Sequence, residues 1–371
     1  MEMICVEECC EILDSMRIPI TATERKAGKY PYYGANGIQD YVSDYIFDDE
    51  LVLLAEDGGN FGSKERPIAY RVSGKCWVNN HAHVLKPKKE MNVDYLCYSL
   101  MFYNVEGIIN GATRQKLTQS AMRKMKIPIR GMEEQLKIVE KLNKIISIKE
   151  KRKQELQYLD ECVNARFVEM FGDPVMNEKG WPTKPLLAMG QCKNGMNFHY
   201  NDEGVEINCL GVGDFKDFSS IDKTDELPTV SLNEMPSEEY LLKDDDIVFV
   251  RSNGNKALVG RSLAVYPGDV PTTFSGFCIR YRKYDNETIV PYLLRVLKTD
   301  SMRMKMAGRG ANIQNLNQQI LGTLIIPVPP IKLQKQFADF VHQVDKSKVA
   351  VQKALDEAQL LFDSLMQEYF G

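Results

Sequence analysis

The feature that most constrains the fold of this sequence is an internal repeat. Residues 111–172 align without a gap with residues 310–371, and Gly, Gln, Leu and Pro recur at matched positions. The phrase GATRQKL, which opens the first copy, returns as GANIQNL, and each is followed by an Ile-Pro pair and a long charged segment. The chain is therefore predicted to repeat one plan, a globular domain followed by a long helix.

A second, weaker sequence similarity lies upstream of each copy of the repeat. The segment DDELVLLAEDGG (48–59) resembles DDDIVFVRSNG (244–254). In each, an acidic turn precedes a short apolar run that ends in a Gly/Asn-rich loop, a pattern typical of a buried strand. The repeat therefore extends into the globular domains.

Residues 133–170 contain no Gly or Pro, are rich in Glu, Lys, Gln and Leu, and repeat apolar residues at spacings of three and four. A helix of this length is about 57 Å long. The stretch SIKEKRKQE (147–155) is almost wholly polar, which favours a solvated face over a basic DNA-contacting face. Each helix ends in Phe-Gly, where Gly is expected to cap it. Because neither apolar stripe can be buried alone, the helices are expected to pair as a coiled coil.

The predicted fold class is α+β, with two mixed α/β domains separated by two long antiparallel coiled-coil helices in a pseudo-twofold internal repeat. Antiparallel pairing would hold two similar domains a fixed distance apart. Duplex DNA has local twofold symmetry, which dimeric readers match with spaced half-sites. The predicted parts are a first domain at 1–132, a central spacer helix at 133–172, a second domain at 173–331 and a C-terminal spacer helix at 332–371.

Composition limits the class of protein but not its partner. The 371 residues are enough for two domains, and a net charge of -4 leaves nucleic-acid binding open because phosphate binding needs only a local basic surface. No apolar run is long enough to span a membrane, and the acidic start does not resemble a secretory signal, so a cytoplasmic protein is expected. The nine cysteines form no CxxC pair, which favours reduced thiols.

Motifs for covalent chemistry are missing from the sequence. It has no Asn-Pro-Pro motif of an amino-methyltransferase and no GxxxxGK[ST] phosphate loop, and the ExK at 24–26 is too common a pattern to indicate a nuclease. The four histidines lack the spacing of a metal cluster, and His81 and His83 alternate along an expected strand so that one faces the core. We therefore expect no catalytic residue, metal or cofactor, and a role in recognition.

Candidate DNA contacts combine side chains that pair with bases, such as Arg, Asn and Gln, with Lys for phosphates. One set lies in the repeated phrases and just before them: Arg114, Gln115, Lys116, Arg309, Asn312 and Gln314. A second set follows the buried strand of each domain: Asn60, Lys64 and Arg66 in the first, and Arg251, Asn253, Asn255, Lys256 and Arg261 in the second. Asn36, in YPYYGANG, is a third candidate.

Each candidate also has a structural interpretation. Gly111, Leu117 and their repeats are better explained as parts of the turn between domain and helix, and Gln115 and Gln314 could serve either purpose. The loops 56–66 and 251–261 could be ordinary hairpin turns.

Over essentially its full length the chain resembles the specificity subunit of type I restriction-modification systems. The resemblance rests on KYPYYGANGIQDYV (29–42), NNHAHVLKP (79–87), the repeated GATRQKL and GANIQNL with IPI and IPVPP after them, and the endings FGDP and FG. The order and duplication of these motifs make it specific. The second domain lacks a strong copy of YPYYGANG and has CKNGMNFHYN (192–201) in that region.

The resemblance implies a non-catalytic subunit with two target-recognition domains. Each domain would read half of a split double-stranded DNA sequence, with the helices fixing the spacer. It also implies two methyltransferase (M) subunits docked on the helical regions, with restriction (R) subunits outside them. Two other functions stay open: a stand-alone bipartite DNA-binding regulator, and a coiled-coil scaffold that does not bind DNA.

Overall fold

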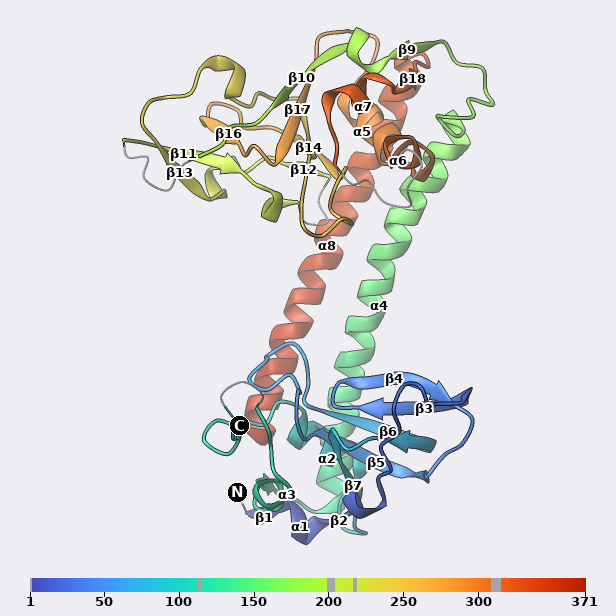
Figure 1. Ribbon diagram of the computed structural model, residues 1–371, viewed down its shortest axis with the longest axis vertical. Helices are drawn as coiled ribbons and strands as arrows, with labels where there is room; N and C mark the ends of the chain where they lie inside the picture. The colour runs from blue at the N-terminus through green and yellow to red at the C-terminus, as the bar shows by residue number, and fades with distance from the viewer. Residues whose placement is uncertain (1, 112–114, 199–203, 216–218, 308–314) are drawn as a thin grey trace. The chain divides into compact units, whose positions relative to one another are not determined.

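The computed structural model describes residues 2–111, 115–198, 204–215, 219–307 and 315–371. The chain divides into two compact units. The first unit consists of Met1–Gln154 with Gln352–Gly371, and the second unit is Glu155–Val351. Figure 1 shows that each unit combines a β-sheet region with segments of two long helices, α4 (Met132–Phe171) and α8 (Ile331–Phe370).

The first unit is built on a six-stranded sheet of order β2-β7-β5-β6-β3-β4. Most neighbours pair antiparallel, and β3 pairs with β6 in parallel. The strands are β2 (Cys10–Ile12), β3 (Ala27–Gly34), β4 (Gly37–Val42), β5 (Phe47–Ala55), β6 (Ala69–Val78) and β7 (Ala82–Pro87). Two short strands, β1 (Met3–Cys5) and β8 (Lys126–Pro128), pair separately. The helices before α4 are α1 (Val6–Cys9), α2 (Val93–Met101) and α3 (Gln119–Arg123).

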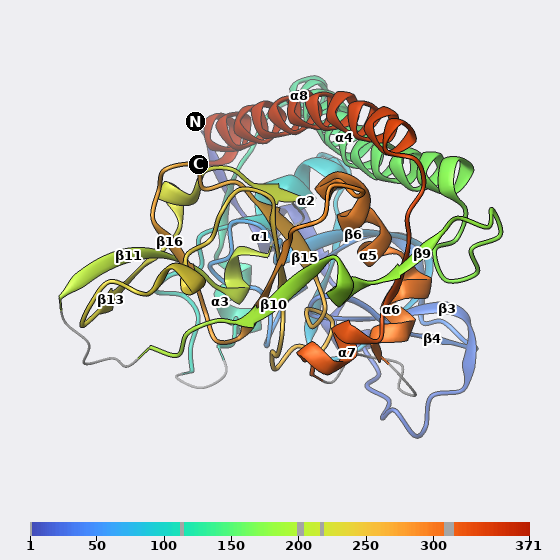
Figure 2. The ribbon, with the colours of Figure 1, turned by 90° about the horizontal axis from the view of Figure 1, so that it is seen from above.

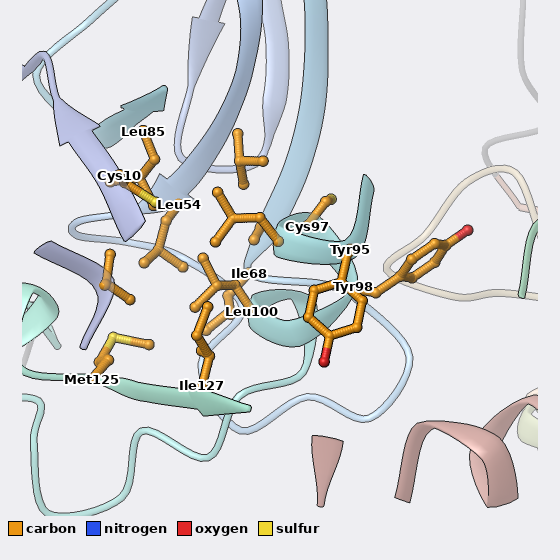
Figure 3. Packing of buried hydrophobic residues seen from close by; sticks show 14 of the residues in the cluster. Cys10, Leu54, Ile68, Leu85, Tyr95, Cys97, Tyr98, Leu100, Met125 and Ile127 are labelled. Carbon is orange, nitrogen blue, oxygen red and sulfur yellow. The ribbon is translucent and has the colours of Figure 1, made fainter. Parts of the chain in front are cut away.

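Helix α2 connects the sheet of the first unit to the long helices. Its residues Tyr95 and Leu100 are buried with Leu54 and Leu85 of the sheet in one apolar cluster (Figure 3). Ile138 and Leu142 of α4 and Phe362 and Tyr369 of α8 belong to the same cluster. The sheet, α2 and the helix pair of this unit therefore share one core.

The second unit holds a five-stranded sheet, a three-stranded sheet and a strand pair, with orders β10-β17-β14-β15-β12, β13-β11-β16 and β18-β9. Figures 1 and 2 both show β11 and β13 lying away from α8. The strands are β9 (Thr183–Pro185), β10 (Gly190–Asn194), β11 (Val205–Leu210), β12 (Ser220–Ile221), β13 (Thr229–Leu232), β14 (Asp246–Val250), β15 (Ser262–Val265), β16 (Thr272–Phe274), β17 (Cys278–Lys283) and β18 (Ile325–Pro327). The helices are α5 (Val290–Lys298), α6 (Asp300–Ala307) and α7 (Gln318–Gly322).

The core of the second unit repeats that of the first. Here α5 lies where α2 lies in the first unit, because Tyr95 donates to the carbonyl of Pro128 at 3.1 Å and Tyr292 to that of Pro327 at 2.9 Å. Tyr292 packs with Phe167 and Phe337 of the long helices and with the five-stranded sheet. The duplication seen in the sequence is thus a duplication of packing.

Within each unit the segments of α4 and α8 run antiparallel. In the first unit Lys141 lies near Tyr369, and Lys149, further along α4, lies near the earlier residue Phe362. In the second unit the ion pair between Lys348 and Asp160 and the ring contact between Phe337 and Phe167 show the same direction. The predicted α+β class with paired long helices is confirmed.

Several local expectations also hold. Most of the polar stretch 147–155 is exposed, in agreement with a solvated face. Gly172 ends α4 with a φ of 75°, a conformation that favours glycine, and its N–H donates to the carbonyl of Val168 at 2.8 Å. Gly111 has a φ of 100°, which supports a turn-forming role.

Candidate nucleic-acid interface

In the first unit the structure brings together two candidate sets that are far apart in the sequence. The N–H of Leu117 donates to the carbonyl of Glu56, at the end of β5, at 2.7 Å. The backbones of Lys116 and Asn110 also exchange two hydrogen bonds, of 2.7 and 2.9 Å. The Lys116 ammonium forms an ion pair with the Glu56 carboxylate at 3.0 Å. The end of the repeated phrase therefore forms one surface with the loop after β5.

The second unit shows the same connection. The N–H of Leu316, which matches Leu117, donates at 2.8 Å to the carbonyl of Arg251 just after β14. Each leucine is completely buried. The leucine retained in both phrases thus anchors the phrase to the loop after the central strand, which explains its repetition.

The candidates of the first unit lie on or near this surface. Asn36 is exposed, and its side-chain amide donates to the carbonyl of Gly58 at 2.9 Å, which ties the β3–β4 turn to the loop after β5. Lys64 and Arg66 are exposed, and Asn60 is partly buried. Gln115 is exposed and lines, together with Lys64, a cavity of about 1120 Å³.

The candidates of the second unit follow β14 in a turn-rich loop. Arg251 is partly buried, and its guanidinium donates to the carbonyl of Gly276 at 3.3 Å. Asn253 and Asn255 use their side-chain oxygens to accept backbone N–H groups within the loop, at 2.8 and 3.1 Å. Lys256 is exposed and Arg261 partly buried at the start of β15. The other candidates, Arg114, Arg309, Asn312 and Gln314, lie outside the described residues.

A buried charged network lies directly beneath the surface of the first unit. The His83 side chain is fully buried, with Nδ1 at 2.7 Å from a carboxylate oxygen of Asp14 and Nε2 at 2.9 Å from the carbonyl of Leu117. The ring therefore bridges the Asp14 carboxylate and the backbone of the repeated phrase. Arg17 donates to Glu56 at 2.6 Å, and the Gln119 amide donates to Asp14 at 2.9 Å. The network joins β5, β7 and the repeated phrase.

Charge balance keeps both acids of this network ionised. Burial raises the pKa of Glu56, but hydrogen bonds from Arg17 and Lys116 outweigh it and hold the pKa below its usual value. Burial likewise raises the pKa of Asp14, and hydrogen bonds from His83 and the Val84 N–H more than offset it. The ligand atoms of Asp14, Glu56 and His83 lie within 4.8 Å of one another, close enough to hold a metal ion. The two cations at Glu56 make an ion-pair network the better explanation of this geometry.

Sequence reasoning missed Asp14, Arg17, Glu56 and Gln119, because acids and a glutamine far apart in the chain carry no local pattern. It placed one histidine of 81 and 83 in the core, and the buried residue is His83. It also missed Phe277, whose side chain is 61% exposed and whose carbonyl accepts the N–H of Arg251 at 2.7 Å. An exposed aromatic ring beside a polar loop is suited to stacking on a base.

The surface of each unit therefore presents amide, guanidinium and ammonium groups on loops held by a buried sheet. Such groups can read base edges and hold phosphates. Among the described residues, no helix is both long and apolar enough to cross a membrane.

The comparison with protein families agrees with this arrangement. The family model for the type I restriction modification DNA specificity domain matches residues 1–158 and again residues 212–358. The chain belongs to this family. The two matched segments fall in the two halves of the internal repeat, so the family match is itself duplicated.

Individual relatives support the assignment. A Haemophilus influenzae protein named as a type I restriction enzyme specificity subunit is 36% identical over 38% of this chain and 37% of its own length. The type I restriction enzyme StySPI specificity subunit of Salmonella potsdam is 23% identical over 86% of this chain and 72% of its own. The crystal structure of the type I S subunit from M. genitalium matches with a TM-score of 0.59 and 15% identity, covering 100% of this chain and 96% of that one.

Family membership confirms the expected role in DNA specificity and the expectation of a non-catalytic recognition subunit. The structural match confirms the fold. The residues that contact DNA remain predictions.

Proposed function

We propose that this chain is the specificity subunit of a type I restriction-modification enzyme and that it reads a bipartite double-stranded DNA site. Residues 1–132 and 173–331 are the two target-recognition domains, and the helices at 133–172 and 332–371 set the spacing between half-sites. The observation that carries the proposal is the duplicated junction, in which Leu117 and Leu316 anchor matched phrases to matched loops. Two copies of one loop surface suit two half-sites.

In the first domain, Gln115, Asn36 and Asn60 are the proposed base readers. Lys64, Arg66, Lys116 and Arg114 hold phosphates. This division follows from chemistry, since a side-chain amide can pair bidentately with adenine whereas ammonium groups favour phosphate. The buried acids beneath Lys116 fix its position without removing it from solvent, because its side chain is 48% exposed.

In the second domain the proposed contacts come from the loop after β14. Asn253 and Asn255 use their oxygens within the loop, so their amide N–H groups are the ends that face a base or phosphate. Arg251, Lys256 and Arg261 supply positive charge, and Phe277 offers a ring for stacking. Arg309, Asn312 and Gln314 complete the proposed set from the repeated phrase.

The partners proposed for the helical regions are two methyltransferase subunits, with restriction subunits outside them. A cavity of the first unit is lined by Asp363, Met366 and Gln367 of α8. A cavity of about 610 Å³ in the second unit is lined by the matching residues of α4, namely Asn164, Phe167 and Val168. Matched surfaces on the two units would suit two copies of one partner. Because type I DNA methylation acts on cellular DNA, a cytoplasmic location is part of the proposal.

Methylome sequencing tests this function most directly. Cells that express the chain with its cognate methyltransferase should carry methylated bases in one split motif, and cells with the methyltransferase alone should not. Tight binding of a split site without the methyltransferase would instead indicate a stand-alone regulator. Absence of salt-sensitive DNA binding, both for the chain alone and for the chain with the methyltransferase, would indicate a scaffold.

Replacing Gln115 with Ala should relax or change one half of the motif, with a loss of roughly 1–3 kcal/mol at one base pair. Replacing Lys64 with Ala should weaken binding to all DNA sequences. The slope of log affinity against log salt concentration should fall by about one released ion. A matched control is Lys137→Ala, which removes an exposed lysine of α4 that forms an ion pair with Glu133. A Gln115→Ala variant with an unchanged motif would remove this residue from base readout.

A further inference from the structure

The second unit carries a cluster of ionisable side chains that the proposed DNA-recognition function does not use. Arg295 and Lys298 lie one turn apart on α5, where α5 packs against α4 and α8 (Figure 1). Both line a cavity of about 310 Å³, together with His342 and Lys348 of α8. The cavity is lined entirely by residues of the second unit.

No carboxylate among the described residues lies within ion-pair distance of the two cations of α5. The Arg295 Nε atom is buried and has no hydrogen-bond partner, and neither Arg295 nor Lys298 forms an ion pair within 4.0 Å in the described part of the chain. Burial, with the nearby charges of Arg295 and Lys348, lowers the pKa of Lys298 to about 8. Buried charges in proteins are normally paired. Burial lowers the pKa of both groups, and the nearby carboxylates of Asp160, Asp300 and Asp345 only partly offset it.

The described acids around the cavity do not form ion pairs with these two cations. Asp160 of α4 forms its ion pair with Lys348. Asp345 of α8 is partly buried, and its burial raises its pKa. Ser219 and Ser220 add hydroxyl groups to the cavity wall. The site thus combines a guanidinium, an ammonium and hydroxyl donors around an open space.

The first unit provides an internal comparison. Counted from the matched tyrosines, Tyr95 and Tyr292, the residues equivalent to Arg295 and Lys298 are Tyr98 and Met101. Counted from the buried glutamines that accept the N–H of the residue before each helix, Gln135 and Gln334, the residue equivalent to His342 is Asn143.

In the first unit the equivalent side chains satisfy one another. The Tyr98 hydroxyl donates to the side-chain oxygen of Asn143. The residue equivalent to Asp345 is the apolar Ile146. The fold therefore does not require charged side chains at these positions, so packing alone does not explain their presence in the second unit.

We propose that this cavity of the second unit binds a compact oxyanion of the phosphate class, held by Arg295 and Lys298. The anion accepts hydrogen bonds from the guanidinium and the ammonium and supplies the charge that they lack. A pocket of this size is at the small end of ligand sites, which fits inorganic phosphate or a phosphate group on a small body. A phosphate of bound DNA has the same chemistry, so the experiment distinguishes the two sources.

The test is isothermal titration of the full chain with inorganic phosphate in chloride buffer at neutral pH. We expect one saturable site per chain with a Kd of about 1 mM or tighter. The double variant Arg295→Tyr, Lys298→Met carries the residues of the first unit and should bind at least about tenfold more weakly. The charge-matched control Lys332→Met, Lys335→Met removes two exposed lysines of α8 and should bind like the wild type.

The same variants are then titrated with duplex DNA at several salt concentrations. Unchanged DNA affinity, together with lost phosphate binding, identifies a free anion as the ligand. If the double variant instead lowers the slope of log DNA affinity against log salt concentration by about two released ions, the ligand is a nucleic-acid phosphate. Absence of saturable phosphate binding in the wild type, or equal binding in wild type and the Arg295→Tyr, Lys298→Met variant, overturns the proposal. Circular dichroism checks that this variant is folded.

A pH profile provides a second readout that does not depend on stability. Sulfate is the probe, because its charge does not change over this range. Lys298 faces Arg295 on its own helix, Asp160 of α4, and His342, Asp345 and Lys348 of α8. Sulfate affinity should fall as pH rises through about 8, where the free Lys298 loses its proton. In Lys298→Met the fall should be absent; if it persists unchanged, Lys298 is not the anion-binding group.

Discussion

His83 shows how a single residue can hold a recognition loop in place. Its ring forms hydrogen bonds in two directions, with the Asp14 carboxylate on one side and with the Leu117 carbonyl of the repeated phrase on the other. Leu117 in turn donates its own N–H to the carbonyl of Glu56. The phrase is therefore fixed from both faces of its last residue. A loop fixed in this way presents its neighbours Gln115 and Lys116 in one orientation.

Acid should release this attachment. Asp14 and Glu56 have folded-state pKa values below their usual range, so the stability that they contribute is present above the unfolded-state values of about 4 and is lost as pH falls through the folded-state values. Hydrogen exchange at the Leu117 amide, measured from neutral pH downward and corrected for intrinsic rates, should show protection falling below about pH 4.

Glu56→Gln should lower the free energy of unfolding at neutral pH by about 2 kcal/mol, because Arg17 and Lys116 lose their ionic partner. Its stability should also depend less on pH than that of the wild type. Glu65→Gln is the matched control, since Glu65 is an exposed carboxylate of the same loop. Equal acid sensitivity in Glu56→Gln and wild type would assign the pH dependence to other carboxylates.

At the scale of elements, α4 and α8 each begin in one unit and end in the other. Their apolar stripes are buried where a sheet and α2 or α5 cover them, as at Leu142 and Phe337. The polar stretch of α4 at 147–155 is mostly exposed. Because this segment of α4 makes few packing contacts, residues inserted there should disturb the packing least.

Adding seven residues within 147–155 and seven at the matching 346–354 should therefore lengthen the proposed spacer while leaving both half-sites unchanged. Two helical turns add about 10 Å, or about three base pairs. Methylome sequencing reads the spacer directly. A control with Lys151→Gln and Lys153→Gln, which changes charge without length, should keep the original spacer. An unchanged spacer after both insertions would contradict the role of the helices as a ruler.

The elements differ in how far the sequence could predict them. The helices follow from the periodicity of apolar residues and the missing Gly and Pro, and the central strands from short apolar runs such as LVLLA (51–55). The network of Asp14, Glu56 and His83 could not be predicted, because its members are distant in the chain and meet only when β5 and β7 pair. The missing ion pairs of Arg295 and Lys298 could not be predicted either, because only the packed structure shows which groups lie within reach of a side chain.

At the scale of the whole molecule, the duplication predicts modular specificity. Exchanging residues 1–130 for the corresponding domain of another family member should change one half of the methylated motif and preserve the other half. The reason is that the junction contacts of each unit, such as those of Gln135 with Glu90 and Arg130, use atoms of that unit alone.

The measurement is again the methylome, and the reciprocal exchange of residues 173–331 serves as the control because it should alter the other half-site. A change in both halves after one exchange, or in neither, would contradict modular reading.

Each unit contains the last turns of the long helix that begins in the other unit, so neither half of the sequence completes its core alone. Phe362 and Tyr369, from the last turns of α8, are buried in the core built by the first 150 residues, and Phe167 and Phe171, from the end of α4, are buried in the core of the second unit. A chain cut after residue 172 would therefore lack the end of α8 that covers the first core. Its own end of α4 would have no core to pack against. Such a fragment is self-complementary: the free end of α4 in one copy aligns without a gap with the end of α8 that another copy lacks.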